Sequence, residues 1–171
     1  TLTSTEANGL IELTAGFGAS MSGGANNSGS LVVTSNGLVT ATNAGSAVVL
    51  KSGSGSGNIQ VDRSVSGSLG INLEALGGSI TVDSAARLVG DRLNSVSRDT
   101  STLLTDVRQV TSARVLGSNP AIAQNLIIDE LNDVDLISLE AGADAGVIDV
   151  VAGGFIYVGK IDATLGNNVT L

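Results

Sequence analysis

A short unit of two alternating strands joined by a glycine-rich turn recurs along this chain. One copy spans residues 48–62 and the next spans residues 71–83, and in both of them apolar residues occupy alternate strand positions. A third copy has Ile137-Ser-Leu139-Glu-Ala-Gly142 before its turn and Val147-Ile-Asp-Val150 after it. A unit of this size cannot bury its apolar face alone. Repeated units therefore predict a stacked architecture in which each copy covers the next.

The spacing between equivalent leucines sets the size of the repeat. Leu50 and Leu73 are 23 residues apart, and Leu73 and Leu139 are 66 apart, which is three periods of 22. Such a period suits a coil of short strands, each pairing with its counterpart one coil further on at ~4.8 Å. The sequence therefore predicts an all-β fold, a right-handed parallel β-helix (β-solenoid), as a single domain over residues 1–171. Coils of this size predict about eight turns.

Alternation within each unit assigns side chains to the inside or the outside of the coil. The residues predicted to face inward are Ile71, Leu73, Ile80 and Val82, and those predicted to face outward are Asn72, Glu74, Thr81 and Asp83. Asn36-Gly37 in isolation would favour a hairpin, but in a solenoid the same pair makes a corner. Residues 9–16 match the later Leu139–Gly142 stretch and predict a coil at the start, followed by a long outer loop at residues 17–29.

Residues 84–125 interrupt this pattern and leave two interpretations open. The apolar residues with helical spacing are Val89, Leu93, Val96, Leu103, Val107 and Val110. Asn119-Pro120 also favours a helix start. A run of serine and threonine residues, which are weak helix formers, argues against a helix. The alternatives are thus a short helical excursion and irregular, decorated coils, and the three whole periods across this gap favour coils.

Composition excludes several classes of function. Only 2 % of the residues are aromatic, which suits a narrow bore lined by small and branched side chains. With no histidine and no cysteine, the chain cannot form a Ser-His-Asp or Cys-His site, or the usual zinc and iron ligand sets. A net charge of −8 disfavours nucleic-acid binding. No apolar run approaches the ~18 to 20 residues of a membrane helix, so membrane insertion is not expected.

Candidate sites were sought among the glycines and the acidic residues. The Gly53-Ser-Gly55-Ser-Gly57 stretch matches neither phosphate-loop spacing and predicts a corner. A possible calcium site is the acidic cluster Asp129, Glu130, Asp133 and Asp135, although solubilising surface charge explains it equally well. The outward acids that align with repeat positions are Asp62, Glu74, Asp83, Glu140 and Asp149. Repetition favours a solvated face, so no catalysis, no cofactor and no assigned catalytic, cofactor-binding or metal residue is predicted.

Two of the three aromatic residues, Phe155 and Tyr157, lie two positions apart and so share one face of a strand. One interpretation is that they cap the solenoid or fill a wider part of its bore. The alternative is that they form a platform on which a sugar ring stacks.

Units such as Ile71-Asn-Leu-Glu-Ala-Leu-Gly-Gly-Ser-Ile-Thr-Val-Asp and Ile137-Ser-Leu-Glu-Ala-Gly resemble the coils of known bacterial surface proteins. These are the filamentous-haemagglutinin-like adhesins, the autotransporter passengers and very large surface proteins with β-strand repeats. The resemblance covers the chain outside residues 84–125. It implies secretion to the bacterial cell surface, a long rod and attachment to cells or matrix, without catalysis. The secretion domain of the two-partner family carries short Asn-Pro-Asn motifs near its start. This chain has only Asn119-Pro120-Ala121, late in the sequence, so the resemblance is to the solenoid shaft and not to the secretion domain.

Three functions follow as expectations. The first is an extracellular structural or adhesive rod of a bacterial surface protein. The second is a filament or sheath subunit that stacks end to end, because no cap is evident before Gly9 or after Asn168 and uncapped edges accept further strands. The third is a carbohydrate-binding or carbohydrate-active β-helix. The expected partners are other copies or flanking coils at the two ends, with glycans or proteins of a cell surface or matrix along the side.

Overall fold

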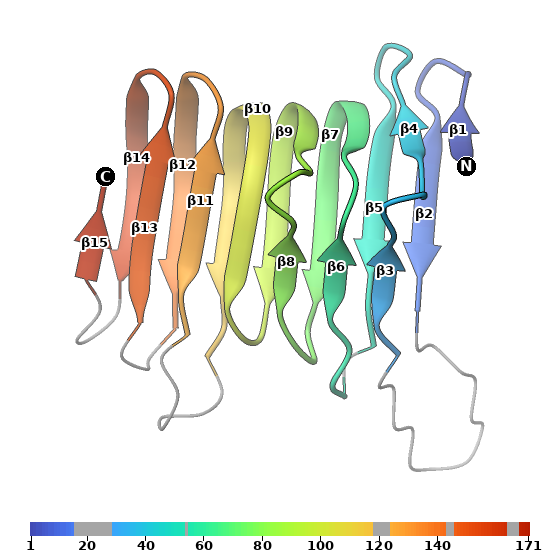
Figure 1. Cartoon of the computed structure of the whole chain (residues 1–171). Coiled ribbons are helices and arrows are strands. Elements are labelled where there is room, and N and C mark those ends of the chain that lie inside the picture. Colours follow the sequence, from blue (N-terminus) through green and yellow to red (C-terminus); the bar gives the residue numbers. More distant parts are fainter. Residues whose placement is uncertain (16–28, 54, 118–123, 143–145, 164–167) are drawn as a thin grey trace.

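The chain winds into a parallel β-solenoid whose strands run across the axis of a short rod (Figure 1). The structure is a computed structural model that describes residues 1–15, 29–53, 55–117, 124–142, 146–163 and 168–171. In these ranges there are 15 strands in one continuous sheet, and all the strand pairings between them are parallel. The all-β solenoid prediction is therefore confirmed.

Equivalent strands of successive coils stack into three ladders. The long ladder contains β2 (Leu10–Thr14), β5 (Ala47–Lys51), the second parts of β7 (Val65–Ala75), β9 (Leu88–Ser97) and β10 (Ser101–Val115), then β12 (Val134–Ala141) and β14 (Ile156–Ala163). The second ladder contains β3 (Leu31–Val33), β6 (Ile59–Val61), β8 (Ile80–Val82), the first part of β10, β11 (Leu126–Glu130), β13 (Val147–Ala152) and β15 (Asn168–Thr170). The short ladder contains β1 (Leu2–Ser4), β4 (Val39–Ala41) and the first parts of β7 and β9, and it ends on the middle of β10.

The predicted period holds on average but not at each step. Leu73 pairs with Ser95, Ser95 with Ala113 and Ala113 with Leu139, so the 66-residue interval consists of steps of 22, 18 and 26 residues. The first step of the long ladder, from Leu13 to Leu50, takes 37 residues. Five further steps of 18 to 26 residues follow it along the described long ladder, so the expected eight turns were too many.

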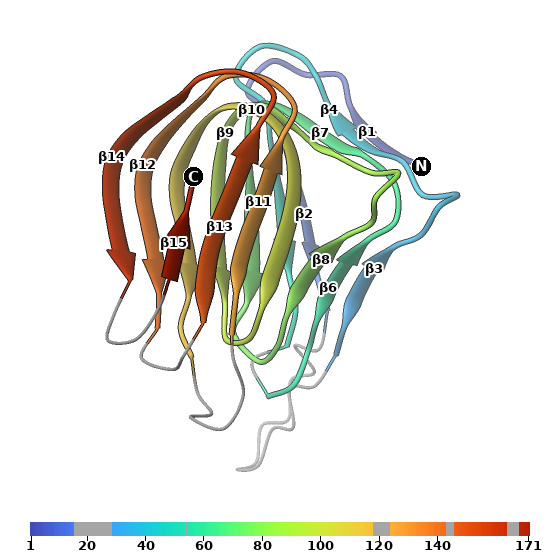
Figure 2. The same cartoon turned by 60° about the vertical axis from the view of Figure 1, so that its left-hand side comes forward.

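The cross-section of the coil changes from three sides to two along the rod. Eight positions separate Ile80 from Leu88, whereas only four separate their partners Ser101 and Thr105. The shorter path removes a corner, and β10 crosses from one ladder to the next as one strand. Figure 2 shows the corners between β3 and β4, β6 and β7, and β8 and β9 projecting to one side, while β11–β12 and β13–β14 turn in a single arch.

Inward side chains of successive coils form continuous apolar rows through the rod. Ile71, Leu73, Ile80 and Val82 are at most 2 % exposed, and their outward neighbours are half-buried or exposed, which confirms the predicted faces. Asn36-Gly37 makes a corner, as expected, because β3 pairs with β6 and not with β4. The outer loop predicted at residues 17–29 lies almost wholly outside the described residues.

The helical alternative for residues 84–125 is wrong over their described part, where β9 and β10 continue the solenoid. Val107, Val110 and Ala113 are all buried in β10 at intervals of three residues, which imitates a helical period. The first interval spans the bend between two ladders, and the second contains an extra residue at a bulge between Val110 and Ser112. The predicted helix start at Asn119-Pro120 lies outside the described residues.

The third copy of the repeat departs from strict alternation at Ile137. Leu136 faces the core, whereas Ile137 is 45 % exposed. Two residues separate the inward Leu136 from the inward Leu139 because their partners in β10, Val110 and Ala113, flank the bulge. Among the residues that the structure describes, no helix has the length and apolar character needed to span a bilayer.

Small polar side chains replace apolar ones in the core where the cross-section changes. Ser95 stands between Leu73 and Ala113 in its row, and Ser101 stands between Ile80 and Leu126. The hydroxyls of Ser97 and Ser101 lie 2.8 Å apart and bond to each other. The Ser95 hydroxyl is buried and has no hydrogen-bond partner among the described residues.

We expect Ser95→Ala to raise the free energy of unfolding by about 1 kcal/mol, because it removes a buried hydroxyl that has no partner. Urea unfolding followed by circular dichroism measures the change. Ser97→Ala is the matched control and should lower stability by a similar amount, since it removes a hydroxyl that is bonded. Equal destabilisation by the two substitutions would show that the Ser95 hydroxyl is satisfied in solution.

Candidate functional site

A polar groove of about 450 Å³ opens on the side of the rod where the short ladder ends. Its lining residues are Gly90, Asp106, Val107, Arg108, Asn132, Asp133, Gly153 and Gly154. They come from four successive coils: β9, β10, the corner between β11 and β12, and the corner between β13 and β14. The groove therefore runs along the rod axis for about 14 Å at one coil per ~4.8 Å. It forms because the corners beyond β10 no longer supply a strand to the short ladder.

Hydrogen bonds across successive coils hold the walls of this groove. Asn132 donates a side-chain N–H to Asp106 Oδ1 at 2.9 Å. Asp133 Oδ1 accepts the backbone N–H of Phe155 at 2.8 Å. A Cβ atom at Gly154 would lie 1.8 Å from Asp133 Oδ1, so a side chain at this position would displace the carboxylate from its bond to Phe155. Among the described residues, these bonds engage one oxygen of each carboxylate.

The acidic cluster considered for calcium is not gathered into one site. Glu130 is only 2 % exposed, and its carboxylate accepts the backbone N–H groups of Val107 at 3.0 Å and Asn132 at 3.1 Å. Asp129 Oδ1 lies 3.8 Å from a guanidinium nitrogen of Arg87, whereas Asp133 accepts the backbone N–H of Phe155. Within the described residues, no group of three or more potential ligands could hold a metal ion. The Glu130 carboxylate instead accepts the backbone N–H of Val107 at a point where β10 has no further neighbouring strand in the short ladder.

Arg108, the cation in the groove, is bound to carboxylates on both sides. Its Nε lies 2.7 Å and its terminal N–H₂ 3.3 Å from the two oxygens of Asp91, and a third nitrogen lies 3.8 Å from Asp135. The hydrogen bond from Arg108 lowers the pKa of Asp91, with Arg92 as a lesser cause. Asp91 in turn raises the pKa of Arg108. The positive charge of the Arg108 guanidinium is therefore already balanced by two carboxylates of the same chain.

We expect Arg108→Ala to raise the pKa of the Asp91 carboxyl towards its ordinary value of 3.8, because the main group that stabilises the carboxylate is removed. In the wild type this ion pair stabilises the fold fully above 3.8, and the contribution is lost as pH falls through the lower pKa of folded Asp91. Carboxyl NMR titration of Asp91 measures both values. Arg92→Ala is the control and should shift the pKa less. Equal shifts would contradict the assignment of Arg108 as the principal partner.

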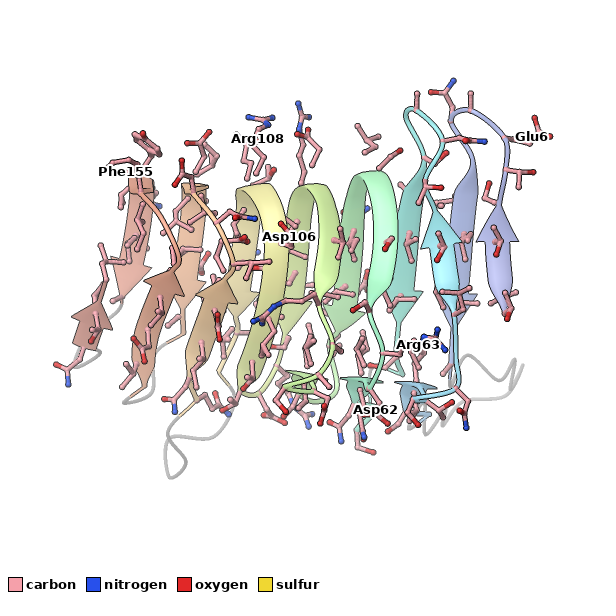
Figure 3. All side chains as sticks on the ribbon, turned by 45° about the horizontal axis from the view of Figure 1, so that its top comes forward. Glu6, Asp62, Arg63, Asp106, Arg108 and Phe155 are labelled. Atoms are coloured by element: carbon pink, nitrogen blue, oxygen red, sulfur yellow. The ribbon has the colours of Figure 1, made fainter. Side chains whose placement is uncertain are left out.

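The aromatic pair lies beside the C-terminal end of the groove. Phe155 follows the lining residue Gly154, and Tyr157 pairs in the ladder with Asp135. Their ring centroids are 6.3 Å apart with the ring planes tilted by 46°. Phe155 is 70 % and Tyr157 57 % exposed, and Tyr157 lies in the same outward row as Asp135, so the part of the prediction that places them inside the bore is wrong. Figure 3 shows Phe155 and Arg108 projecting from the same long edge of the rod, with Asp106 on the face next to them.

The outward acids predicted from the repeat are dispersed over the surface. Asp62 and Asp83 accept hydrogen bonds from Gln60 and Ala85 at the corners. Glu140 forms a bidentate pair with Arg114 at 2.7 and 3.2 Å. Glu74 and Glu140 lie in the same outward row of the long ladder, and Asp149 lies on the second ladder. This placement follows the repeat and pairs no two of these carboxylates in one groove.

Three residues that line the groove were not among the site residues predicted from the sequence: Asp106, Arg108 and Asn132. The first two lie in the stretch that the 22-residue repeat did not align, because the shortened coil shifts their register. Asn132 is a corner residue whose partner, Asp106, is 26 residues away. A search for polar residues at spacings between 17 and 26 would have found such pairs. The same signal identifies the outward hydrogen bond from Asn94 to Asn72, 22 residues apart.

Comparison of the chain with protein-family models, with curated proteins and with solved structures gives no match. The fold itself therefore defines the class: a parallel β-solenoid with coils of about 22 residues, carrying a polar groove on its side. The repeat fold implied by the resemblance to surface adhesins is confirmed, and no family is identified.

Proposed function

We propose that this protein is an extracellular structural and adhesive rod of a bacterial surface, without catalytic activity. The observation that supports the proposal is the single apolar core, which runs through the described coils, while every charged side chain of the described residues except Glu130 lies outside it. Each coil is supported by its neighbours in the ladders, so such a structure maintains a fixed direction over its whole length. The sequence resemblance supplies the surface location.

The two ends of the rod can accept further coils. An inward position of the first coil is uncovered at Leu2, which stacks on the buried Val39 and is 45 % exposed. At the other end Val158 and Val169 are 48 % and 43 % exposed. The outer edges of these coils present unpaired backbone groups, which favour pairing with another strand. Coils of similar cross-section would bury both the apolar side chains and the strand edges.

The alternative of identical copies stacking end to end is less well supported. The first coil includes the short-ladder strand β1, whereas the strands described in the last coils belong to the long and second ladders alone. Placing one copy on another would leave β1 without a strand to pair with. A filament of identical copies should therefore form poorly, while different flanking coils could match each end.

Electron microscopy of the protein as isolated from its source tests the proposal, at near-neutral pH with and without calcium. Antibodies against this chain should label a narrow shaft of uniform width at the cell surface. Labelling confined to the cell interior, or a compact particle without a shaft, would refute the proposal. Continuous filaments of the purified chain with a repeat of roughly 30 to 35 Å, one chain length at ~4.8 Å per coil, would favour identical stacking instead.

A further inference from the structure

The outward orientation of Phe155 and Tyr157 is not explained by the packing of the solenoid. Residues that a following coil would cover point along the rod axis or into the bore. Phe155 instead projects from the long edge of the rod (Figure 3), and Tyr157 occupies an outward position in the same row as Asp135 and Gln109. In a chain with only 2 % aromatic residues, two of them meet at the surface beside this polar groove.

The groove and the aromatic pair together offer two kinds of contact. The rings provide flat apolar surfaces that are already exposed. The carboxylates of Asp106 and Asp133 and the amide of Asn132 provide hydrogen-bonding groups held in place by bonds between coils. A sugar ring has one apolar face of C–H groups and an edge of hydroxyls, which matches a stacking surface flanked by acceptors.

We propose that this groove, with Phe155 and Tyr157 at its C-terminal end, binds an uncharged carbohydrate chain that lies along the rod axis. The groove spans four coils and is open along the rod, which suits an extended chain better than a single small molecule. This inference deepens the adhesive part of the proposed function. It identifies an uncharged glycan as the class of surface that the rod contacts.

The charges around the groove select against acidic glycans. Asp106 and Asp133 line it, and Asp91 and Asp135 lie at its border. The cation in the lining, Arg108, already binds both border carboxylates. Sulfated, uronic or sialylated chains would therefore meet repulsion without an available counter-charge, whereas neutral hydroxyls can donate hydrogen bonds to the carboxylates.

The test applies the intact chain to an array of neutral gluco-, galacto- and manno-configured oligosaccharides together with sulfated and sialylated ones. Titration calorimetry then measures the affinity for the neutral ligands bound. Tyr157→Ala and Phe155→Ala should each weaken binding about tenfold, because each removes one stacking surface. Tyr157→Phe, which retains the ring, and Val32→Ala, an exposed apolar residue on the second ladder, are the controls and should change affinity little. Asp106→Asn should weaken binding several-fold without a change in fold.

The dependence on salt separates this proposal from its competitors. Affinity for a neutral chain should be unchanged between low and high salt, whereas binding of a charged polymer falls as screening increases. Binding confined to anionic glycans, affinity unchanged in the alanine variants, or no binding of any neutral oligosaccharide up to about 10 mM would each overturn the inference. The test reads binding by the isolated chain and microscopy reads rod formation and location, so either proposal can fail alone.

Discussion

Glu130→Ala should lower the free energy of unfolding by about 2 to 4 kcal/mol, although it removes a single acidic side chain. In the folded protein this carboxylate is 2 % exposed and accepts two backbone N–H groups, from Val107 and Asn132. Both donors lie where the short ladder has no further strand. Alanine would leave both without this acceptor, and the buried N–H of Val107 would then cost its full desolvation free energy.

Urea unfolding followed by circular dichroism measures this change. Glu130→Gln keeps one acceptor oxygen but brings a second donor towards the same backbone, so it should fall between the wild type and the alanine variant. Asp129→Ala, at the adjacent and exposed position, is the matched control and should change stability by less than about 1 kcal/mol. If the two alanine variants were equally stable, the Glu130 carboxylate would act as surface charge and its bonds to the backbone N–H groups would not contribute to stability.

Ile80→Ala should lower the free energy of unfolding by about 2 to 5 kcal/mol, because it opens a cavity in the middle of the apolar rows. Ile80 is fully buried and is stacked between Ile59 and Ser101 of the neighbouring coils. Neither neighbour can move far into the space, since both are held by the strand pairing of the second ladder. A solenoid coil has no other layer from which to fill the gap.

The neighbouring Thr81→Ala tests whether the effect depends on the face of the strand. Thr81 is exposed between Gln60 and Thr102, and its loss should cost less than about 1 kcal/mol. Denaturant midpoints and hydrogen exchange of the backbone amides in β6 and β8 measure both variants. Similar losses in the two variants would mean that the strand does not present one face to the core.

The repeat could be predicted because it follows from the local alternation of apolar and polar residues. Ile71, Leu73, Ile80 and Val82 alternate with polar residues, and a period of two allows only one face to be buried. The interval from Leu73 to Leu139 gave the correct number of coils across the interrupted region, since residues in one row must return at whole coils. The same argument could not give the length of each step, because a corner can gain or lose residues without moving the rows.

The groove could not be predicted from these local patterns. Asp106 and Arg108 line the groove because no neighbouring strand covers them, and this absence arises only because the coil that contains β10 takes a shorter path between the ladders. The acidic cluster could be recognised in the sequence, but its members have different roles. Glu130 is buried and accepts a backbone N–H group, whereas Asp133 lines the groove. Both are acids near the same corner, and the sequence offers no signal that distinguishes them.

The sequence by itself determined the class of fold, the coil size and the inward and outward faces, because these follow from alternation and from the spacing of equivalent apolar residues. The tertiary structure decided where the coil changes from three sides to two, which carboxylate is buried and which lines a groove, and that Phe155 and Tyr157 point outward. The reason is physical: alternation is a property of each strand, whereas a groove is formed by residues of four coils whose relative position is set only when the ladders pair.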